Sequence, residues 1–106
     1  MIELYMHHDY GHGWLEVPMD LIEHSKLQRK ISLYSYQSFS GATAYLEEDC
    51  DASLLIHELD VLNMDYKIIH EHAKGSQDSF VRSRPRFVAR KNIEDYFITT
   101  IPMVAL

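Results

Sequence analysis

The sequence has few of the residues that mark disulfide-rich, disordered or membrane-spanning chains. Its 106 residues include one cysteine, three prolines and four glycines. Because Cys50 has no partner within the chain, no internal disulfide can form, which favours a reducing, cytoplasmic setting. No apolar run approaches the roughly 18 residues of a membrane-spanning helix, and the N-terminus lacks the basic and apolar segments of a secretory signal. We therefore expect a cytoplasmic protein that does not contact membranes.

Basic residues are scarce over most of the chain and gather in one short segment. Residues 1–79 contain five lysines and arginines against 14 acidic residues, whereas residues 80–91 contain five basic residues and no acidic one. The formal net charge of the whole chain is −6 at pH 7. An acidic surface repels nucleic acid and attracts basic proteins. This balance predicts a partner protein with a basic surface and disfavours nucleic acid as a partner.

Hydrophobic periodicity predicts an α+β fold. Alternating apolar residues indicate five strands, over residues 2–6, 14–17, 31–37, 42–48 and 65–72. Two helices are expected, one over 18–29 that begins at Pro18 and one over 51–63 with apolar residues at helical spacing. These elements are typical of a two-layer fold, in which a mainly antiparallel sheet of about five strands carries both helices on one face.

The C-terminal part of the chain differs from the rest in composition. We expect a single α+β domain over residues 1–91. Residues 92–106 end in the uncharged run YFITTIPMVAL and are interpreted as an apolar extension, either a strand or a docking tail. A tail that completed the sheet of a second copy would produce a homodimer, so the sequence leaves the oligomeric state open.

Two parts of the sequence resemble each other. Residues 2–5 (IELY) parallel residues 31–34 (ISLY) at an offset of 29, and residues 14–16 (WLE) parallel residues 45–47 (YLE) at an offset of 31. Each predicted pair of strands precedes a predicted helix. The chain therefore reads as a β-β-α unit that occurs twice and is followed by a final strand. The alternative is that these short matches arose by chance.

Histidines gather around the first predicted turn and near the end of the last predicted strand. Three imidazoles with an open coordination position form a common type of catalytic zinc site. The sequence thus suggests a metal site, with zinc as its ion, built from five histidines: His7, His8, His12, His70 and His72. Their spacing matches no established metal motif. The alternative is that they are exposed turn and strand-end residues and that the protein has no cofactor.

Acidic and aromatic residues form a candidate surface for protein binding. Tyrosine and tryptophan are enriched at binding hot spots, and the acidic run EEDCD follows the fourth predicted strand. The residues assigned to this surface are Tyr10, Trp14, Tyr36, Glu47, Glu48, Asp49 and Asp51. The structural alternative is that the acids begin the second helix, one of them as its N-cap, and that the aromatic residues pack across strands.

Arginines recur at every second residue of the basic segment. On an extended strand, Arg82, Arg84 and Arg86 would point to one side, and aromatic residues flank them. Charge and stacking together can hold single-stranded nucleic acid. The alternative is an edge strand, interrupted at Pro85, whose charges discourage aggregation.

The segments GHGWLEVP, YSYQ and TAYLEEDCDA together resemble a group of small proteins carried by phages, prophages and plasmids. The resemblance covers roughly residues 4–60 and implies an accessory protein in the cytoplasm of a host cell, with no activity to transfer. The leading hypothesis is a non-catalytic protein that binds a host or phage protein and inhibits a host defence system, of the anti-CRISPR or antirestriction type. The alternatives are a metal-binding protein or metal-dependent enzyme, and a nucleic-acid binder acting through residues 82–91.

Overall fold

A computed structural model describes residues 1–89 of the chain. In chain order, its elements are β1 (Ile2–His8), β2 (Gly13–Pro18), α1 (Met19–His24), β3 (Tyr36–Gln37), β4 (Thr43–Glu47), α2 (Ala52–Val61), β5 (Tyr66–His72) and a 3-10 helix over Phe80–Ser83. The apolar extension predicted over 92–106, and the homodimer that it would form, lie outside the described residues.

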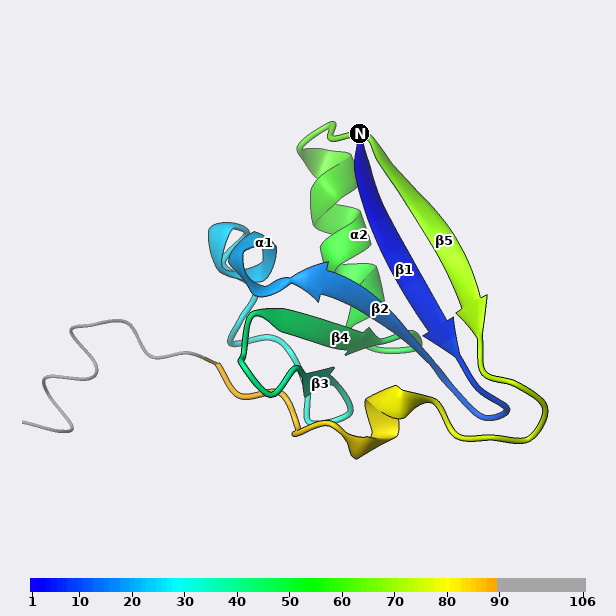
Figure 1. Ribbon diagram of the computed structural model, residues 1–106. Coiled ribbons are helices and arrows are strands. Elements are labelled where there is room, and N and C mark those ends of the chain that lie inside the picture. The colour runs from blue at the N-terminus through cyan, green and yellow to red at the C-terminus, as the bar shows by residue number, and fades with distance from the viewer. Residues whose placement is uncertain (90–106) are drawn as a thin grey trace, which may run out of the picture.

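The five strands form one mixed sheet in the order β3-β4-β2-β1-β5 (Figure 1). Three of the strand pairs are antiparallel, while β1 and β5 pair in parallel. The predicted α+β fold, with a mainly antiparallel five-stranded sheet and two helices, is confirmed. The parallel pair is a difference from the expectation. It arises because the chain leaves β4, passes through α2 and returns in the same direction at the far edge, as parallel strands require.

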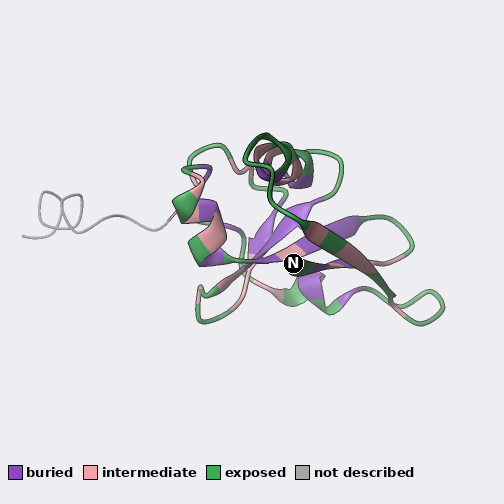
Figure 2. Ribbon diagram, turned by 90° about the horizontal axis from the view of Figure 1, so that it is seen from above, coloured by how far each residue is buried: buried purple, intermediate pink, exposed green. Residues whose placement is uncertain are grey.

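Both helices pack on the same face of the sheet. Alternate strand positions supply this face, including Leu4 of β1, Leu15 of β2 and Leu46 of β4, all of which are buried. They join Ile22 of α1 and Leu55 of α2 in one apolar cluster. In Figure 2 the buried residues concentrate in the central strands, between the helices and the C-terminal segment. The helix-facing side of the sheet is therefore the main core.

The opposite face of the sheet is partly covered by the C-terminal segment. Val81 is fully buried against a small aromatic cluster that contains Trp14, Tyr36 and Tyr45. The edge strand predicted over 80–88 is wrong: Phe80–Ser83 is a 3-10 helix, and an isolated bridge joins Arg86 to Tyr36. The hydroxyl of Ser79 accepts a bond from the N–H of Val81 and so favours a helical turn.

The first helix is shorter than the residues 18–29 expected for it. Lys26 adopts a left-handed backbone conformation with φ of 59°, and the N–H of Leu27 donates back to the carbonyl of Ile22 at 3.0 Å. These features define a Schellman motif, which ends a helix. Because lysine rarely adopts this conformation, the sequence did not indicate the stop, and α1 ends at His24.

The strand expected over 31–37 is reduced to two residues by a buried aspartate. The carboxylate of Asp51 accepts bonds from the hydroxyls of Ser32 (2.7 Å) and Ser35 (2.5 Å) and from the N–H of Ser32 (3.0 Å). These bonds hold the chain before β3 as a loop. Asp51 does occupy the N-cap position of α2, but its side chain makes no capping bond, because it is directed to the serines.

The register of the sheet follows the predicted repeat. Leu15 pairs with Leu46, which is its counterpart at the offset of 31. The flanking pairs are Trp14 with Glu47 and Glu16 with Tyr45. The offset of 31 relates Trp14 to Tyr45 and Glu16 to Glu47, so it converts one flanking pair into the other. Strands β2 and β4 are therefore related by a local two-fold rotation about the leucine pair. The order β-β-α thus occurs twice along the chain, although residues 31–34 (ISLY) lie in a loop where residues 2–5 (IELY) lie in β1.

Candidate functional site

The histidine-rich turn between β1 and β2 is shaped by one carboxylate, that of Asp9. Its Oδ1 accepts hydrogen bonds from the backbone N–H groups of Gly11 (3.0 Å) and His12 (3.1 Å), as aspartate commonly does in turns. The N–H of Asp9 donates to the carbonyl of His12 at 3.0 Å and closes the same turn. The conformation of the turn therefore depends on Asp9 and not on the imidazoles.

Asp9 also receives bonds from a distant part of the chain. Its Oδ2 accepts from the N–H of Ser79 (3.0 Å) and from Nε of Arg82 (2.5 Å), and Nη2 of Arg82 donates to Oδ1 at 3.0 Å. The Asp9 side chain is fully enclosed, while that of Arg82 is 28% exposed. The paired bonds from Arg82, with those from the backbone, hold the pKa of Asp9 well below its usual range.

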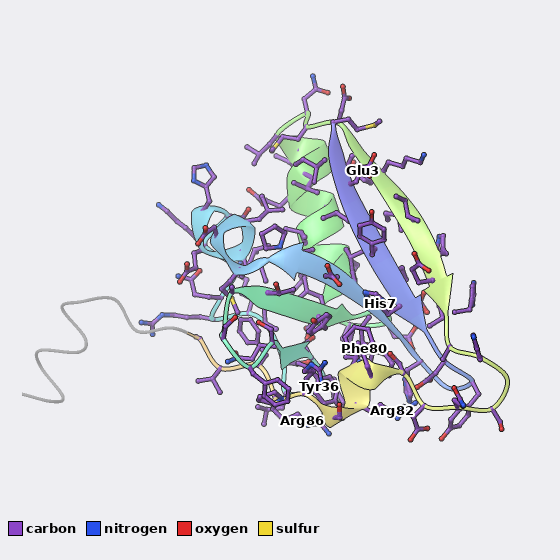
Figure 3. The ribbon with its side chains drawn as sticks, in the orientation of Figure 1. Glu3, His7, Tyr36, Phe80, Arg82 and Arg86 are labelled. Carbon is purple, nitrogen blue, oxygen red and sulfur yellow. The ribbon has the colours of Figure 1, made fainter. Side chains whose placement is uncertain are left out.

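Each arginine of the basic segment that the structure describes, Arg82, Arg84 and Arg86, lies over at least one aromatic ring. The pairs are Arg82 with Trp14 (5.1 Å) and Tyr10 (5.4 Å), Arg84 with Phe39 (4.7 Å) and Phe80 (5.1 Å), and Arg86 with Tyr36 (4.4 Å). Figure 3 shows Arg82 and Arg86 on the same side of the molecule as Tyr36. Because the segment begins as a 3-10 helix, the expected row of three arginines along one strand is not formed.

A cleft of about 150 Å³ opens beside these rings. Its lining residues are His12, Trp14, Tyr34, Tyr36, Glu47, Arg82 and Arg86, and we refer to it as the Trp14 cleft. The indole of Trp14 is 2% exposed and meets the ring of Tyr36 edge to face at 5.9 Å. Among the described residues, the buried Nε1 of Trp14 has no hydrogen-bond partner. An unpaired buried donor costs free energy.

A group of residues able to hold a metal ion lies at one edge of the Trp14 cleft. One ligand atom from each of His12, Glu47 and Asp49 lies within 4.8 Å of the others. Glu47 is 6% exposed, and its Oε2 accepts the N–H of Cys50 at 2.9 Å. Its Oε1 lies 3.6 Å from Nδ1 of His12. The backbone thus holds one oxygen of Glu47 and leaves the other directed to the histidine.

The structure divides the five predicted metal-binding histidines among three places. His12 lies at the Trp14 cleft, whereas His7 lies elsewhere on that face of the sheet, where its Nε2 is 2.8 Å from Oε1 of Glu16. The other three, His8, His70 and His72, meet at the ends of β1 and β5. The single five-histidine site suggested by the sequence is therefore not assembled.

At the strand ends the ring of His8 contacts both other histidines. The ring of His8 lies 4.7 Å from that of His72 and 5.0 Å from that of His70. Burial lowers the pKa of His8 from its ordinary value, the carboxylate of Glu48 opposes this shift, and the two other imidazoles add to it. Burial, with a smaller contribution from the neighbouring imidazoles, therefore favours the neutral form of His8.

The residues assigned to protein binding fall into two groups. Three of them, Trp14, Tyr36 and Glu47, come from three strands and line the Trp14 cleft. Three others are exposed, namely Tyr10, Glu48 and Asp49. The seventh, Asp51, is 3% exposed and bonded to the serines before β3, which gives it a structural role.

Two residues of this region escaped the sequence interpretation. Asp9 pairs with Arg82, which lies 73 positions later in the chain. No local pattern indicates a pairing over that distance. Tyr34 lines the cleft but was expected inside a strand.

Cys50 is exposed and lies next to several acidic residues. A hydrogen bond to Glu47 raises the pKa of its thiol, and the neighbouring carboxylates add to this shift.

Comparisons with known proteins identify no relative of the chain. No protein-family model, curated protein sequence or solved structure matches it. Within residues 1–89, neither helix has the length and apolar character needed to cross a membrane. The candidate site therefore has to be interpreted from its own geometry.

Replacement of Asp9 by Asn should destabilise the protein at neutral pH. The variant loses the charge that pairs with Arg82, and we expect the free energy of unfolding to fall by about 2–3 kcal/mol. Because the pKa of Asp9 in the folded protein lies well below its ordinary value of 3.8, the stabilisation is fully present above that pH and is lost progressively as the pH falls from there toward the pKa of the folded protein. Urea unfolding of both proteins should give a difference in stability that narrows steadily as the pH is lowered from about 4 to about 2.

The matched control is Asp78→Asn, which removes an exposed carboxylate that also acts on Arg82. Its effect on the free energy of unfolding should stay within about 0.5 kcal/mol. A difference between wild type and Asp9→Asn that stayed constant down to pH 2 would contradict the pairing of Asp9 with Arg82.

Proposed function

We propose that the protein is a non-catalytic accessory protein of a phage or other mobile element that acts by binding another protein. In this proposal it works in the host cytoplasm and inhibits a host defence system of the anti-CRISPR or antirestriction type. The observation that supports a binding role is the Trp14 cleft. Trp14, Tyr36 and Glu47 come from three different strands and line one depression with exposed residues beside it.

The size of the cleft favours a side chain of a partner protein over a free small molecule. Its volume of about 150 Å³ is below the roughly 300–1,000 Å³ typical of small-molecule sites. Protein interfaces, in contrast, commonly seat one anchoring side chain in a small pocket ringed by exposed residues. The exposed ring of Tyr10, which lies under Arg82, extends the aromatic surface out of the cleft.

The charges around the cleft favour a basic partner. Glu47 lies in the cleft, and Glu48 and Asp49 follow it on the surface. Arg82 is neutralised by its pairing with Asp9. A lysine or arginine of the partner could therefore enter beside Glu47, while the net acidic charge of the chain accelerates the approach of a basic surface.

A variant with the exposed part of this surface removed should lose its partner. We expect the tagged protein to capture a basic protein from host lysate, and the triple variant Tyr10→Ala, Glu48→Gln, Asp49→Asn to capture at least about tenfold less, since a few central residues carry most of the binding energy. The matched control, Glu58→Gln with Asp60→Asn, changes two acidic residues on α2 instead. Equal capture by both variants, or no partner at all, would count against the proposal.

Zinc binding is a second candidate function, favoured by the group of His12, Glu47 and Asp49. Zinc accepts imidazole nitrogen and carboxylate oxygen at about 2.0–2.2 Å, so two ligands of one tetrahedral ion lie about 3.3 Å apart. The distance of 3.6 Å between Nδ1 of His12 and Oε1 of Glu47 is close to that value. An ion there would also pair the buried carboxylate of Glu47.

Trp14 is the single tryptophan of the chain and lies beside this group, with its ring 5.9 Å from that of His12. Zinc added to the protein should therefore change the tryptophan fluorescence, and His12→Gln should abolish the change. The control His24→Gln removes an exposed histidine on α1 and should leave the change intact. A fluorescence response that persisted in His12→Gln would exclude zinc at this group.

A further inference from the structure

Three imidazoles from two strands converge at one end of the sheet, away from the Trp14 cleft. The parallel register places His8 of β1 directly opposite His72 of β5. His70 lies two residues before His72 and therefore on the same face of the strand. The ring of His8 is nearly parallel to both, with interplanar angles of 14° to His72, on which it stacks, and 20° to His70, which it meets edge to edge.

Two of these rings direct nitrogen atoms toward each other. Nε2 of His8 lies 2.7 Å from Nδ1 of His70, so one nitrogen donates a proton and the other accepts it. Two imidazole nitrogens on one zinc ion are about 3.3 Å apart, since each Zn–N bond measures about 2.0–2.1 Å. An ion could thus replace the shared proton if the rings separated by a few tenths of an ångström. The nitrogens of all three rings do not lie within 4.8 Å of one another in this conformation. His70 and His72 are exposed, so their side chains have room to rotate toward one ion.

A carboxylate lies on the other side of the central ring. A Cβ atom added to Gly13 would meet Nδ1 of His8 at 3.1 Å and the carboxylate carbon of Glu48 at 3.2 Å. The absence of a side chain at Gly13 therefore leaves room for both groups next to it. Metal-bound histidines commonly have a carboxylate near the ring nitrogen that does not bind the metal, where it orients the ring. Glu48 lies on that side of His8.

We propose that His8, His70 and His72 bind a divalent transition-metal ion of the zinc type at the ends of β1 and β5, with Glu48 orienting the ring of His8. Imidazole ligands select zinc, copper and nickel over magnesium and calcium. Among the described strands, β5 pairs with β1 alone. An ion held by both strands would stabilise this edge of the sheet, because a ligand that binds the folded state raises its stability.

This site shares Glu48 with the surface of the proposed function, but its three histidines belong neither to that surface nor to the group formed by His12, Glu47 and Asp49. Both candidate metal sites take carboxylates from the three consecutive residues at the end of β4. Glu47 and Asp49 lie beside His12, and Glu48 lies beside His8. A zinc titration must therefore be carried out on a protein in which the first group is disabled. His12→Gln provides that background and leaves His8, His70 and His72 unchanged.

The test is a calorimetric titration of the full chain carrying His12→Gln with zinc chloride, together with NMR spectra of the histidine rings. We expect one bound ion and shifted ring signals for His8, His70 and His72. Adding His70→Gln or His72→Gln should weaken zinc binding by about tenfold or more, since even the loss of a residue supporting a metal ligand has an effect of 10–100-fold. Magnesium chloride should produce neither heat nor shifts.

The control is His57→Gln in the same background, which removes an exposed histidine on α2 and should bind zinc as tightly as its parent. His70 and His72 are exposed, so their variants should unfold at the same temperature as the parent when no metal is added. The proposal is overturned if the His12→Gln protein binds no zinc, or if His70→Gln and His72→Gln bind it as tightly as His57→Gln does. Neither result would affect the binding role of the Trp14 cleft.

Discussion

The pairing of Asp9 with Arg82 is the constraint on which the rest of this surface depends. One enclosed carboxylate accepts bonds from the turn after β1 and from the start of the C-terminal segment. It thereby joins two parts of the chain that are 73 positions apart. Because an enclosed charge without a partner is very costly, both parts must adopt their positions together. The carboxylate fixes the turn and the position of Arg82 at the same time.

The position of Arg82 determines how the second face of the sheet is covered. Its guanidinium lies over Trp14 and Tyr10, and the 3-10 helix that contains it buries Val81 against the aromatic cluster. Without this segment the face would consist of exposed aromatic rings. With it, the same rings form a cleft whose walls come from distant parts of the chain. A feature that resembles a binding pocket thus follows from one ion pair and the rings beside it.

Elements with local periodicity could be predicted from the sequence. The alternation of strand residues predicted the sheet, and the offset of 31 between WLE and YLE corresponds to the register of β2 with β4. The offset of 29 also has a structural counterpart. His7 of β1 pairs with Trp14 of β2, and Tyr36 of β3, which is 29 positions after His7, pairs with Tyr45 of β4. Asn63, expected to end the second helix, follows it with a left-handed φ of 55°. Each of these features follows from a local pattern or from the match between two short segments of the sequence.

Features that depend on distant contacts could not be predicted. The serines that bind Asp51 turn an expected strand into a loop, and Lys26 ends α1 in a conformation that lysine seldom adopts. The basic segment was interpreted as a strand because its alternation is local, whereas its conformation follows from Ser79 and from the bond to Asp9. The histidines illustrate the same limit, since their grouping depends on the parallel pairing of β1 with β5.

The central claim is that Asp9 holds the C-terminal segment on the sheet, and native-state hydrogen exchange tests it most directly. In Asp9→Asn, the amides of Ser79, Val81 and His12 should exchange much faster than in the wild type, while those of Leu55 and Leu59 in α2 stay protected. This pattern is expected because the helix-facing core does not involve Asp9. Unchanged protection at Ser79 and Val81, or uniform loss of protection through the whole domain, would contradict the account.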